Sequence, residues 1–326
     1  MATPEPNEGS GRRMPEFLHS LKDAKDLLEM IASEKGLAPA VVEKDYWIMH
    51  CLWGLQKLGL NFEMKGGTSL SKGWQMVERF SEDIDIRFDA PAKLNLKGDK
   101  PGHAEARLAF YDDLASRIRI EGITTERNRK HDDPKSQNGG ISLRYPAHFA
   151  MAPGLRTEVL LEVGFAKTAP NEPRDFSSWA LDRALASHAN VIDNRALGVK
   201  CFYPEHTFVD KIQTICRRFR QYRDRNDPEK DKPQFFLRHY YDLYMLLEVP
   251  RVKAFIGTPD YEAYKKEKLK TADMAEFETR DAFLLKDARA YELFEKEFPE
   301  VAGIIYPPRP KFADIIARIR EYAPNL

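Results

Sequence analysis

The stretch from Met64 to Asp89, MKGGTSLSKGWQMVERFSEDIDIRFD, constrains this chain more than any other. It contains the alternating run Asp83, Ile84, Asp85, Ile86, which is typical of a β-strand because successive side chains of a strand point to opposite faces. The two isoleucines are expected in the core, and the two carboxylates project together from the other face, about 7 Å apart. Because such like charges repel each other, the pair predicts a site for a hard divalent cation such as Mg2+.

Two glycines and two hydroxyl side chains precede this strand, at Gly66, Gly67, Thr68 and Ser69. Glycine lets backbone N–H groups approach a phosphate closely, and a helix N-terminus behind the turn would favour an anion. A phosphate-binding turn beside a metal-binding strand predicts a nucleotide site. An Asp-x-Asp pair alone would be a weak indicator, since surface strands often carry two acids.

These segments, GGTSLSK and RFSEDIDI, resemble the first motif of the DNA polymerase β-type nucleotidyltransferases, and specifically that of the AbiEii/AbiGii toxin family. The resemblance is dense over residues 43–89 and looser over residues 204–246. It implies an α/β (α+β) fold, with a small mixed sheet, flanking helices and a helical C-terminal domain. On this basis we expect a turn that binds the triphosphate of an NTP and two Mg2+ ions held by the carboxylates; the expected nucleotide-binding residues of the turn are Gly66, Gly67, Thr68, Ser69 and Lys72.

A third carboxylate is needed if two metal ions are to be held. The segment RTEVLLEVGF offers Glu158 and Glu162, which share one face of a predicted strand. Glu162 lies deeper in the apolar run, where a charge is costly unless it is paired or metal-bound. We therefore favour Glu162 as the third ligand; the alternative is a salt bridge at a sheet edge.

The predicted helix from Pro39 contains Glu43-Lys44-Asp45-Tyr46-Trp47, which resembles the family's EKDYW segment. Charged residues on a helix usually form its solvent-exposed face. The alternative is that Lys44 or Asp45 positions the glycine turn or the nucleotide.

Two further family motifs fall in the C-terminal half. Lys211, on a predicted helix after Pro204, is expected to contact the triphosphate. Arg238 and Asp242 match an R-x-x-x-D signature, in which the aspartate is the functional acid. The charged stretch 217–233 separates these motifs and leaves their relative placement open. The alternatives are a surface lysine and an acid favoured by a helix dipole.

A basic and aromatic patch follows Lys211 on the same predicted helix. Arginine matches phosphate oxygens, and tyrosine can stack on an unpaired base, so the patch predicts contact with RNA. The acids that follow, at residues 224–231, also fit a solvent-exposed helix with alternating charges. The residues of the predicted patch are Arg217, Arg218, Arg220, Tyr222, Arg223 and Arg225.

Composition sets wider limits. Lys+Arg and Asp+Glu both number 51, so affinity for an anionic partner depends on local clusters. The three cysteines have no metal-ligand spacing and are expected as small buried residues in a reducing compartment. No apolar run is long enough for a membrane span, which favours the cytoplasm. We expect a disordered leader (1–14), a nucleotidyltransferase domain (15–172) and a mainly helical domain (173–326).

The resemblance implies a bacterial toxin from a toxin–antitoxin or phage-defence (abortive infection) system. Its acceptor would be RNA, such as a tRNA 3′ end, and its partner a separately encoded antitoxin. Two alternatives remain at this stage. One is a small-molecule nucleotidyltransferase of the antibiotic-modifying kind, and the other is a non-catalytic RNA-binding or antitoxin-binding protein with the same fold.

Overall fold

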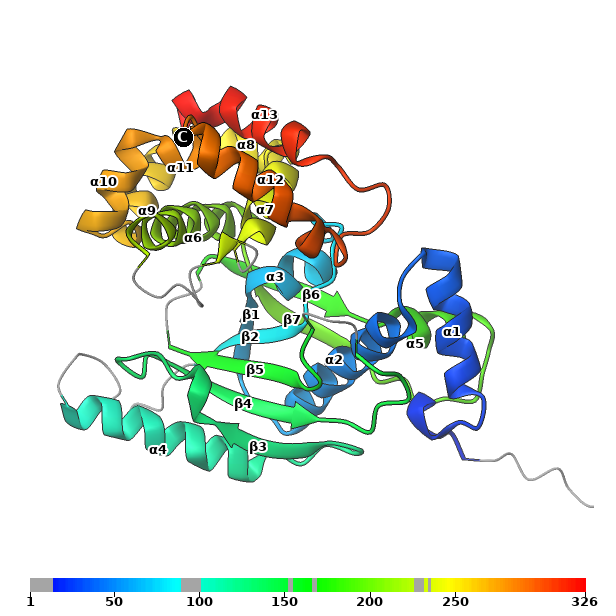
Figure 1. Ribbon diagram of the computed structural model, residues 1–326. Helices are drawn as coiled ribbons and strands as arrows, with labels where there is room; N and C mark the ends of the chain where they lie inside the picture. Colours follow the sequence, from blue (N-terminus) through cyan, green and yellow to red (C-terminus); the bar gives the residue numbers. More distant parts are fainter. Residues whose placement is uncertain (1–13, 89–100, 152–154, 166–168, 226–231, 234–235) are drawn as a thin grey trace, which may run out of the picture.

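The computed structural model describes residues 14–88, 101–151, 155–165, 169–225, 232–233 and 236–326 (Figure 1). The expected leader at residues 1–13, and most of the loop expected at 93–103, lie outside the described residues. The described part combines a seven-stranded mixed sheet with many helices, which confirms the α/β (α+β) class. No helix within it is long and apolar enough to span a bilayer.

The N-terminal part is helical, as predicted. A short helical turn (Leu18–Ser20) precedes α1 (Ala24–Lys35) and α2 (Pro39–Lys57). Gly36 ends α1 with a φ of +63°, a conformation that glycine adopts at little cost. Pro39 occupies the first turn of α2, where its missing N–H is no loss.

The sheet has the strand order β3-β4-β5-β2-β1-β7-β6. Neighbouring strands are antiparallel except for β1 with β7 and β2 with β5, which are parallel. The strands are β1 (Phe62–Lys65), β2 (Asp83–Phe88), β3 (Thr124–Asn128), β4 (Asn138–Arg144), β5 (Val159–Gly164), β6 (Asn171–Phe176) and β7 (Ala196–Phe202). Helix α4 (Pro101–Arg117) packs on β3 and β4, while α2 packs on β7, β2 and β5.

The sheet continues past the domain boundary expected after residue 172. That boundary falls inside β6, and β7 lies between β6 and β1 in the same sheet. The sequence did not reveal β6, whose segment NEPRDF is polar and contains Pro173. Proline is compatible with an edge strand, and β6 is at the edge. Helix α5 (Trp179–Ala186) connects the last two strands.

The helical lobe begins after β7 and lies over one side of the sheet (Figure 1). Its first helix, α6, has Pro204 in the first turn and buries the predicted stripe of Phe208, Ile212, Ile215 and Phe219. The helices are α6 (Pro204–Asp224), α7 (Leu237–Leu246), α8 (Pro250–Phe255), α9 (Pro259–Lys268), α10 (Thr271–Thr279), α11 (Asp281–Leu284), α12 (Ala288–Ala302) and α13 (Phe312–Tyr322), followed by a short turn (Ala323–Asn325).

Residues 70–80 join the two hydrophobic cores. Trp74 and Phe80 belong to the core around the sheet, whereas Leu70 and Val77 belong to the core of the helical lobe. The same segment bonds to the chain between α12 and α13: Phe80 donates its N–H to the carbonyl of Ile304 at 2.7 Å. The segment before β2 is therefore held from both sides.

Two histidines, the buried His50 and the half-buried His19, connect α2 to its surroundings. His50 donates from Nε2 to the carbonyl of Glu121 at 2.9 Å and accepts the Asn194 amide at Nδ1, at 2.8 Å. This pattern requires the neutral ring, because a proton on Nδ1 would face an N–H donor. Burial lowers the pKa of His50, and burial followed by the nearby His50 lowers the pKa of His19 to about 4. The three cysteines are free and buried, as expected.

These histidines predict loss of stability in mild acid. Their pKa values are lowered in the fold from 6.5, so below pH 6.5 the unfolded chain takes up protons that the folded chain does not. The free energy of unfolding should fall by about 1–2 kcal/mol between pH 7.5 and pH 5 from the half-buried His19 alone, and further from His50. Urea titrations at the two pH values measure it. His50→Gln should reduce the difference in free energy of unfolding between the two pH values, and substitution of the exposed His188 by Gln should not. The same difference for the unmodified protein and both variants would refute the role of His50.

Candidate active site

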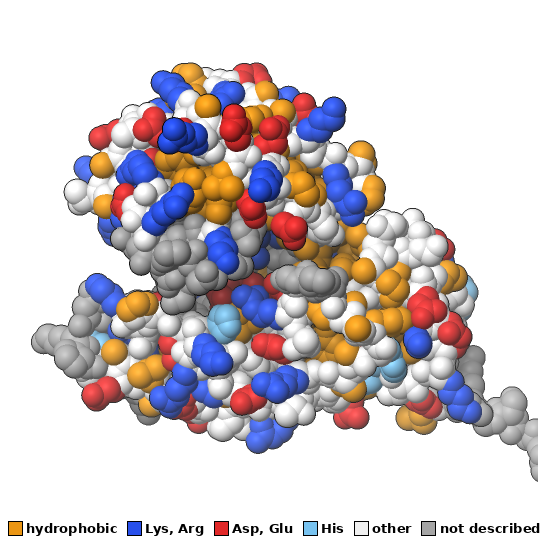
Figure 2. All heavy atoms as spheres, in the orientation of Figure 1, with side chains coloured by type: hydrophobic (Ala, Val, Ile, Leu, Met, Phe, Trp, Pro, Cys, Tyr) orange, Lys and Arg blue, Asp and Glu red, His pale blue; other side chains and the backbone are white. Residues whose placement is uncertain are grey.

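Three carboxylates lie on one face of the sheet. Ile84 and Ile86 are fully buried on the opposite face of β2, as the alternation predicts, so Asp83 and Asp85 share a face. Glu162 on β5 stands directly opposite Asp85 in the parallel register. Figure 2 shows a hollow between the helical lobe and the sheet, with acidic and basic side chains inside it.

The electrostatics of these acids show a shortage of positive charge. Burial, and then the charges of Asp85 and Asp83, raise the pKa of Glu162 to about 8. Burial is also the main cause that raises the pKa of Asp83 to about 6, and the guanidinium of Arg156 opposes the rise. Carboxylates hold their protons this tightly when ionising both members of a pair is unfavourable. A cation at this position would relieve the repulsion.

Arg156 is the cation beside Asp83, and sequence reasoning missed it. Its Nη1 lies 2.6 Å from Asp83 Oδ1 and 3.5 Å from Glu82 Oε1. It comes from the loop that leads into β5, where no periodic pattern marks it. Glu158, the other candidate for the third acid, precedes β5 and accepts a hydrogen bond from Thr157 at 3.0 Å. The described contacts therefore bring Glu162, rather than Glu158, to the other acids.

The glycine turn lies against Asp85. Gly66 follows β1 with a φ of +75°, and a Cβ at this residue would lie 2.1 Å from Asp85 Oδ2. A Cβ on Gly67 would lie 2.6 Å from Ser81 Oγ and 2.8 Å from the guanidinium of Arg79. Only glycine permits backbone this close to the side chains around it. Backbone and carboxylate therefore meet where the sequence predicts a phosphate beside a metal.

The hydroxyls of the turn brace it from within. Thr68 Oγ1 donates to the carbonyl of Asp83, and Ser69 Oγ donates to the carbonyl of Gly66 at 3.0 Å. Both side chains are buried. The helix expected behind the turn is short: one α-turn, α3 (Gly66–Thr68), and one π-turn (Ser69–Gly73). A Cβ on Gly73 would lie 2.7 Å from Phe176, so the turn ends where it meets the sheet.

Lys72 points to a different partner from the one expected. Its ammonium lies 2.6 Å from Asp45 Oδ1 and 4.1 Å from the centre of the Trp179 ring. Asp45 also accepts the backbone N–H of Trp179 at 3.0 Å. In this structure Lys72 fixes the turn to α2 and α5.

The charged residues of α2 are buried, so the prediction of a solvent-exposed face was wrong. Glu43 accepts the backbone N–H groups of His148 and Phe149. Lys44 donates to Glu82 Oε2 at 2.8 Å and to the carbonyl of Arg156 at 2.7 Å. Successive residues of a helix point in directions about 100° apart, so these side chains reach separate loops. The alternative prediction, a positioning role, agrees with these contacts.

Lys211 and Asp242 meet in the interior, although the sequence left their relation open. Lys211 Nζ lies 2.8 Å from Asp242 Oδ2, and Arg79 donates to both Asp242 oxygens at 2.6 and 2.8 Å. Burial alone would raise the pKa of Asp242, but Arg79 and then Lys211 hold it well below its usual range. Arg238, one turn earlier on α7, is half-buried, and its charge also acts on Asp83. Arg79 is the first residue of the RFSEDIDI motif, but the sequence alone assigned it no role.

The predicted RNA patch is partly engaged inside the helical lobe. Arg220 pairs with Asp273 at 2.9 Å, and Arg223 with Glu276 at 2.8 Å. Tyr222 is half-buried, with its ring 5.1 Å from that of Phe294. Arg225 lies over the Tyr222 ring at 5.9 Å. Arg217 is exposed, and Arg218 is half-buried with its Nη1 3.4 Å from Gln221 Oε1.

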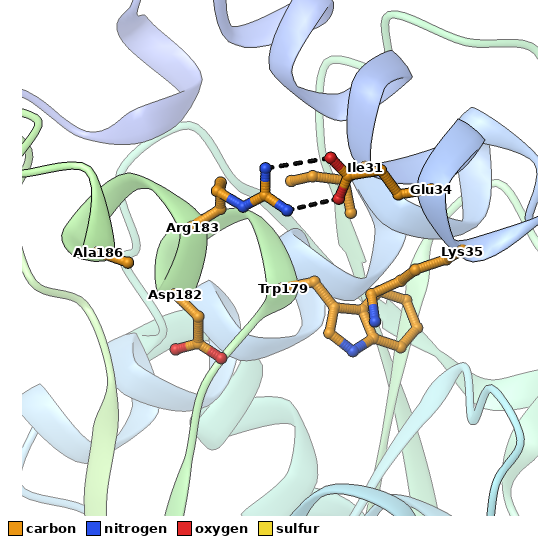
Figure 3. Close-up of a pocket in the computed structure, with 7 residues that line it drawn as sticks. All are labelled: Ile31, Glu34, Lys35, Trp179, Asp182, Arg183 and Ala186. Carbon is orange, nitrogen blue, oxygen red and sulfur yellow. Dashed lines mark hydrogen bonds and ion pairs between the residues drawn. The ribbon is translucent and has the colours of Figure 1, made fainter.

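A separate groove of about 440 Å3 lies between α1 and α5 (Figure 3). Glu34 and Arg183 form an ion pair across it, and the Trp179 ring lies beside the Lys35 ammonium. None of the predicted site residues lines this groove. Trp179, which also contacts Lys72, connects its wall to the back of the glycine turn.

The donor set at the sheet face suits a hard divalent cation. Asp83, Asp85 and Glu162 offer carboxylate oxygens, which Mg2+ prefers, and their mutual repulsion lacks a full internal counter-charge. In the described part of the chain, however, no three His, Cys, Asp or Glu side chains are already arranged around a common point as a metal site. One reason is that the Asp83 carboxylate is directed to Arg156. The residues would fit a divalent cation only after a change in their side-chain orientation.

Comparison with known proteins identifies the family. The family model described as nucleotidyl transferase AbiEii toxin, type IV toxin–antitoxin system, matches residues 47–318. No curated protein matches the chain. The matched region is most of the chain and includes the glycine turn, the three carboxylates and the Lys211–Asp242 pair, and the chain therefore belongs to the AbiEii family of nucleotidyl transferase toxins.

Proposed function

We propose that this protein transfers a nucleotide from an NTP to an RNA acceptor, with a tRNA 3′ end as the first candidate. The observation that carries the proposal is the contact of the glycine turn with Asp85, opposite Glu162. This contact joins backbone that can approach a phosphate to carboxylates that need a cation. The acceptor and the role of Mg2+ rest on the family resemblance.

The reaction assigns a task to each group. Asp83, Asp85 and Glu162 would hold Mg2+, which supplies charge neutralisation at the phosphates and lowers the pKa of an attacking hydroxyl. The backbone of Gly66 and Gly67 would contact the triphosphate. The acceptor hydroxyl would lose its proton to water as its oxygen attacks the α-phosphorus. The bond from the α-phosphorus to the oxygen that bridges to the β-phosphate would break, and pyrophosphate would leave.

The cations of the helical lobe would face the leaving group. Lys211 and Arg238 lie on α6 and α7, and the charges of both act on the acids around them. Positive charge near the departing pyrophosphate stabilises the charge that develops there. Asp242, fully buried between Arg79 and Lys211, would act by positioning these cations.

A transfer assay tests the reaction. Purified protein is incubated with Mg2+, each labelled NTP and total tRNA, and label on RNA is measured. Asp85→Asn should reduce transfer by more than about 100-fold. Loss of a residue that only hydrogen-bonds to a metal ligand typically costs about 10–100-fold. Asp85→Asn should also abolish growth inhibition in cells. The control Glu158→Gln removes a nearby acid and should keep both nucleotide transfer and growth inhibition. Full growth inhibition by folded Asp85→Asn would support the non-catalytic alternative.

Gly66→Ala separates close packing from backbone strain. The new Cβ would overlap the Asp85 carboxylate, so transfer should fall by at least about tenfold, on the scale of a misplaced group at a reacting centre. Gly59→Ala is the matched control, because Gly59 has a φ of +71° and open space around it. Both variants should lose about 1–2 kcal/mol of stability from the left-handed backbone. Equal transfer activity of the two variants would argue against contact of the Gly66 backbone with the triphosphate.

A small-molecule acceptor is the second candidate, because Arg220 and Arg223 already have carboxylate partners. Salt dependence distinguishes the two. If RNA phosphates bind the helical lobe, RNA affinity should fall steeply with ionic strength, and Arg217→Gln with Arg218→Gln should flatten the slope. Filter binding between 50 and 200 mM salt, about the range over which such contacts weaken, measures it. A flat slope for the unmodified protein would favour the small-molecule acceptor.

A further inference from the structure

We propose that Arg156 is a built-in counter-ion for Asp83. Its guanidinium neutralises this carboxylate while no divalent cation is bound, and it turns to the phosphates of the nucleotide when cation and nucleotide bind. The inference rests on the proposed function. It adds a residue that controls how metal binding and nucleotide binding depend on each other.

The guanidinium covers the oxygen that a metal would need. Arg156 Nη1 lies 2.6 Å from Asp83 Oδ1, while the Asp83 side chain is only 13% exposed. The Arg156 side chain is 33% exposed, so solvent reaches part of it while it contacts Asp83. A cation that binds Asp83 through this oxygen competes with Arg156 for it.

The backbone of Arg156 is held independently of its side chain. Its N–H donates to Glu82 Oε2 at 2.9 Å, and its carbonyl accepts the Lys44 ammonium at 2.7 Å. Lys44 also binds Glu82 at 2.8 Å and is fully buried. The Cα of Arg156 is therefore fixed, and the guanidinium can change partners by side-chain rotation while the loop stays in place.

The charges around the site make this exchange favourable only with a nucleotide. Displacing Arg156 from Asp83 leaves a guanidinium without its strongest partner, which weakens metal binding to the free protein. A triphosphate offers a new partner, since the planar fork of arginine matches phosphate oxygens. Metal and nucleotide should therefore bind with positive coupling, and by linkage each raises the affinity of the other equally.

Metal titration tests this without an activity assay. Mn2+ binding is measured by calorimetry for the unmodified protein and for Arg156→Gln, with and without a non-hydrolysable NTP analogue. Without nucleotide, Arg156→Gln should bind Mn2+ about tenfold more tightly, within the usual range of such couplings. In the presence of Mn2+ it should bind the analogue about tenfold more weakly. The two affinities move in opposite directions, which mere loss of structure would not produce.

Two control variants complete the design. Arg144→Gln removes the same charge from an exposed ion pair on β4 and should change neither affinity. Arg156→Lys keeps the charge beside Asp83 but not the fork, so it should keep weak metal binding while losing nucleotide affinity. If Arg156→Gln does not fold, Arg156→Lys still tests the nucleotide part of the inference. Mn2+ affinity that is unchanged or weaker in Arg156→Gln, or stronger in Arg156→Lys than in Arg156→Gln, overturns the inference.

Asp85→Asn separates failure of this inference from failure of the proposed function. If Asp85→Asn abolishes Mn2+ binding and Arg156→Gln leaves it unchanged, the carboxylates hold the metal and only the counter-ion role is wrong. If Asp85→Asn leaves Mn2+ binding intact, the carboxylates do not form the metal site, and the proposed function is wrong along with the inference.

Discussion

Repulsion between carboxylates on one sheet face is the constraint on which the site depends. The parallel register of β2 and β5 sets Asp85 opposite Glu162, and the alternation of β2 adds Asp83 to the same face. Burial intensifies the repulsion because it removes the water that would screen it. The nearby loops supply partial compensation through Arg156, and the glycine turn leaves no Cβ to separate Asp85 from the backbone. This arrangement is the one on which the proposed metal site rests.

The buried charges of α2 keep that arrangement in place. Lys44 pairs with Glu82, which directly precedes Asp83, and Asp45 pairs with Lys72 at the end of the glycine turn. A buried ion pair contributes little net stability but is costly to break, so it specifies one position for each partner. One helix thus fixes both components of the site, the carboxylate strand and the phosphate turn.

The sequence predicted the placement of the three acids where a local pattern carries the information. The two-residue period of a strand suffices for Asp83 and Asp85, and an acid within an apolar run suffices for Glu162. The burial of Lys44 and Asp45 has no such signal, because adjacent helix residues point in different directions and their partners come from distant loops. Arg79 and Asp242 are 163 residues apart, and only tertiary packing joins them. Charge types alone do not show which of the many arginines pairs with which acid.

The Arg79–Asp242–Lys211 network explains how a site made by a sheet can include residues of a separate helical lobe. The two lobes have their own hydrophobic cores, and apolar contact between them runs through residues 70–80 and through Ile304. Asp242 is fully buried and binds a cation from each side: Arg79 from the segment before β2 and Lys211 from α6. Removing that carboxylate would leave two buried cations facing each other, which is far more costly than losing an exposed pair. The network therefore joins the helical lobe to the segment before β2 beside Gly67, where the Arg79 guanidinium leaves no room for a Cβ.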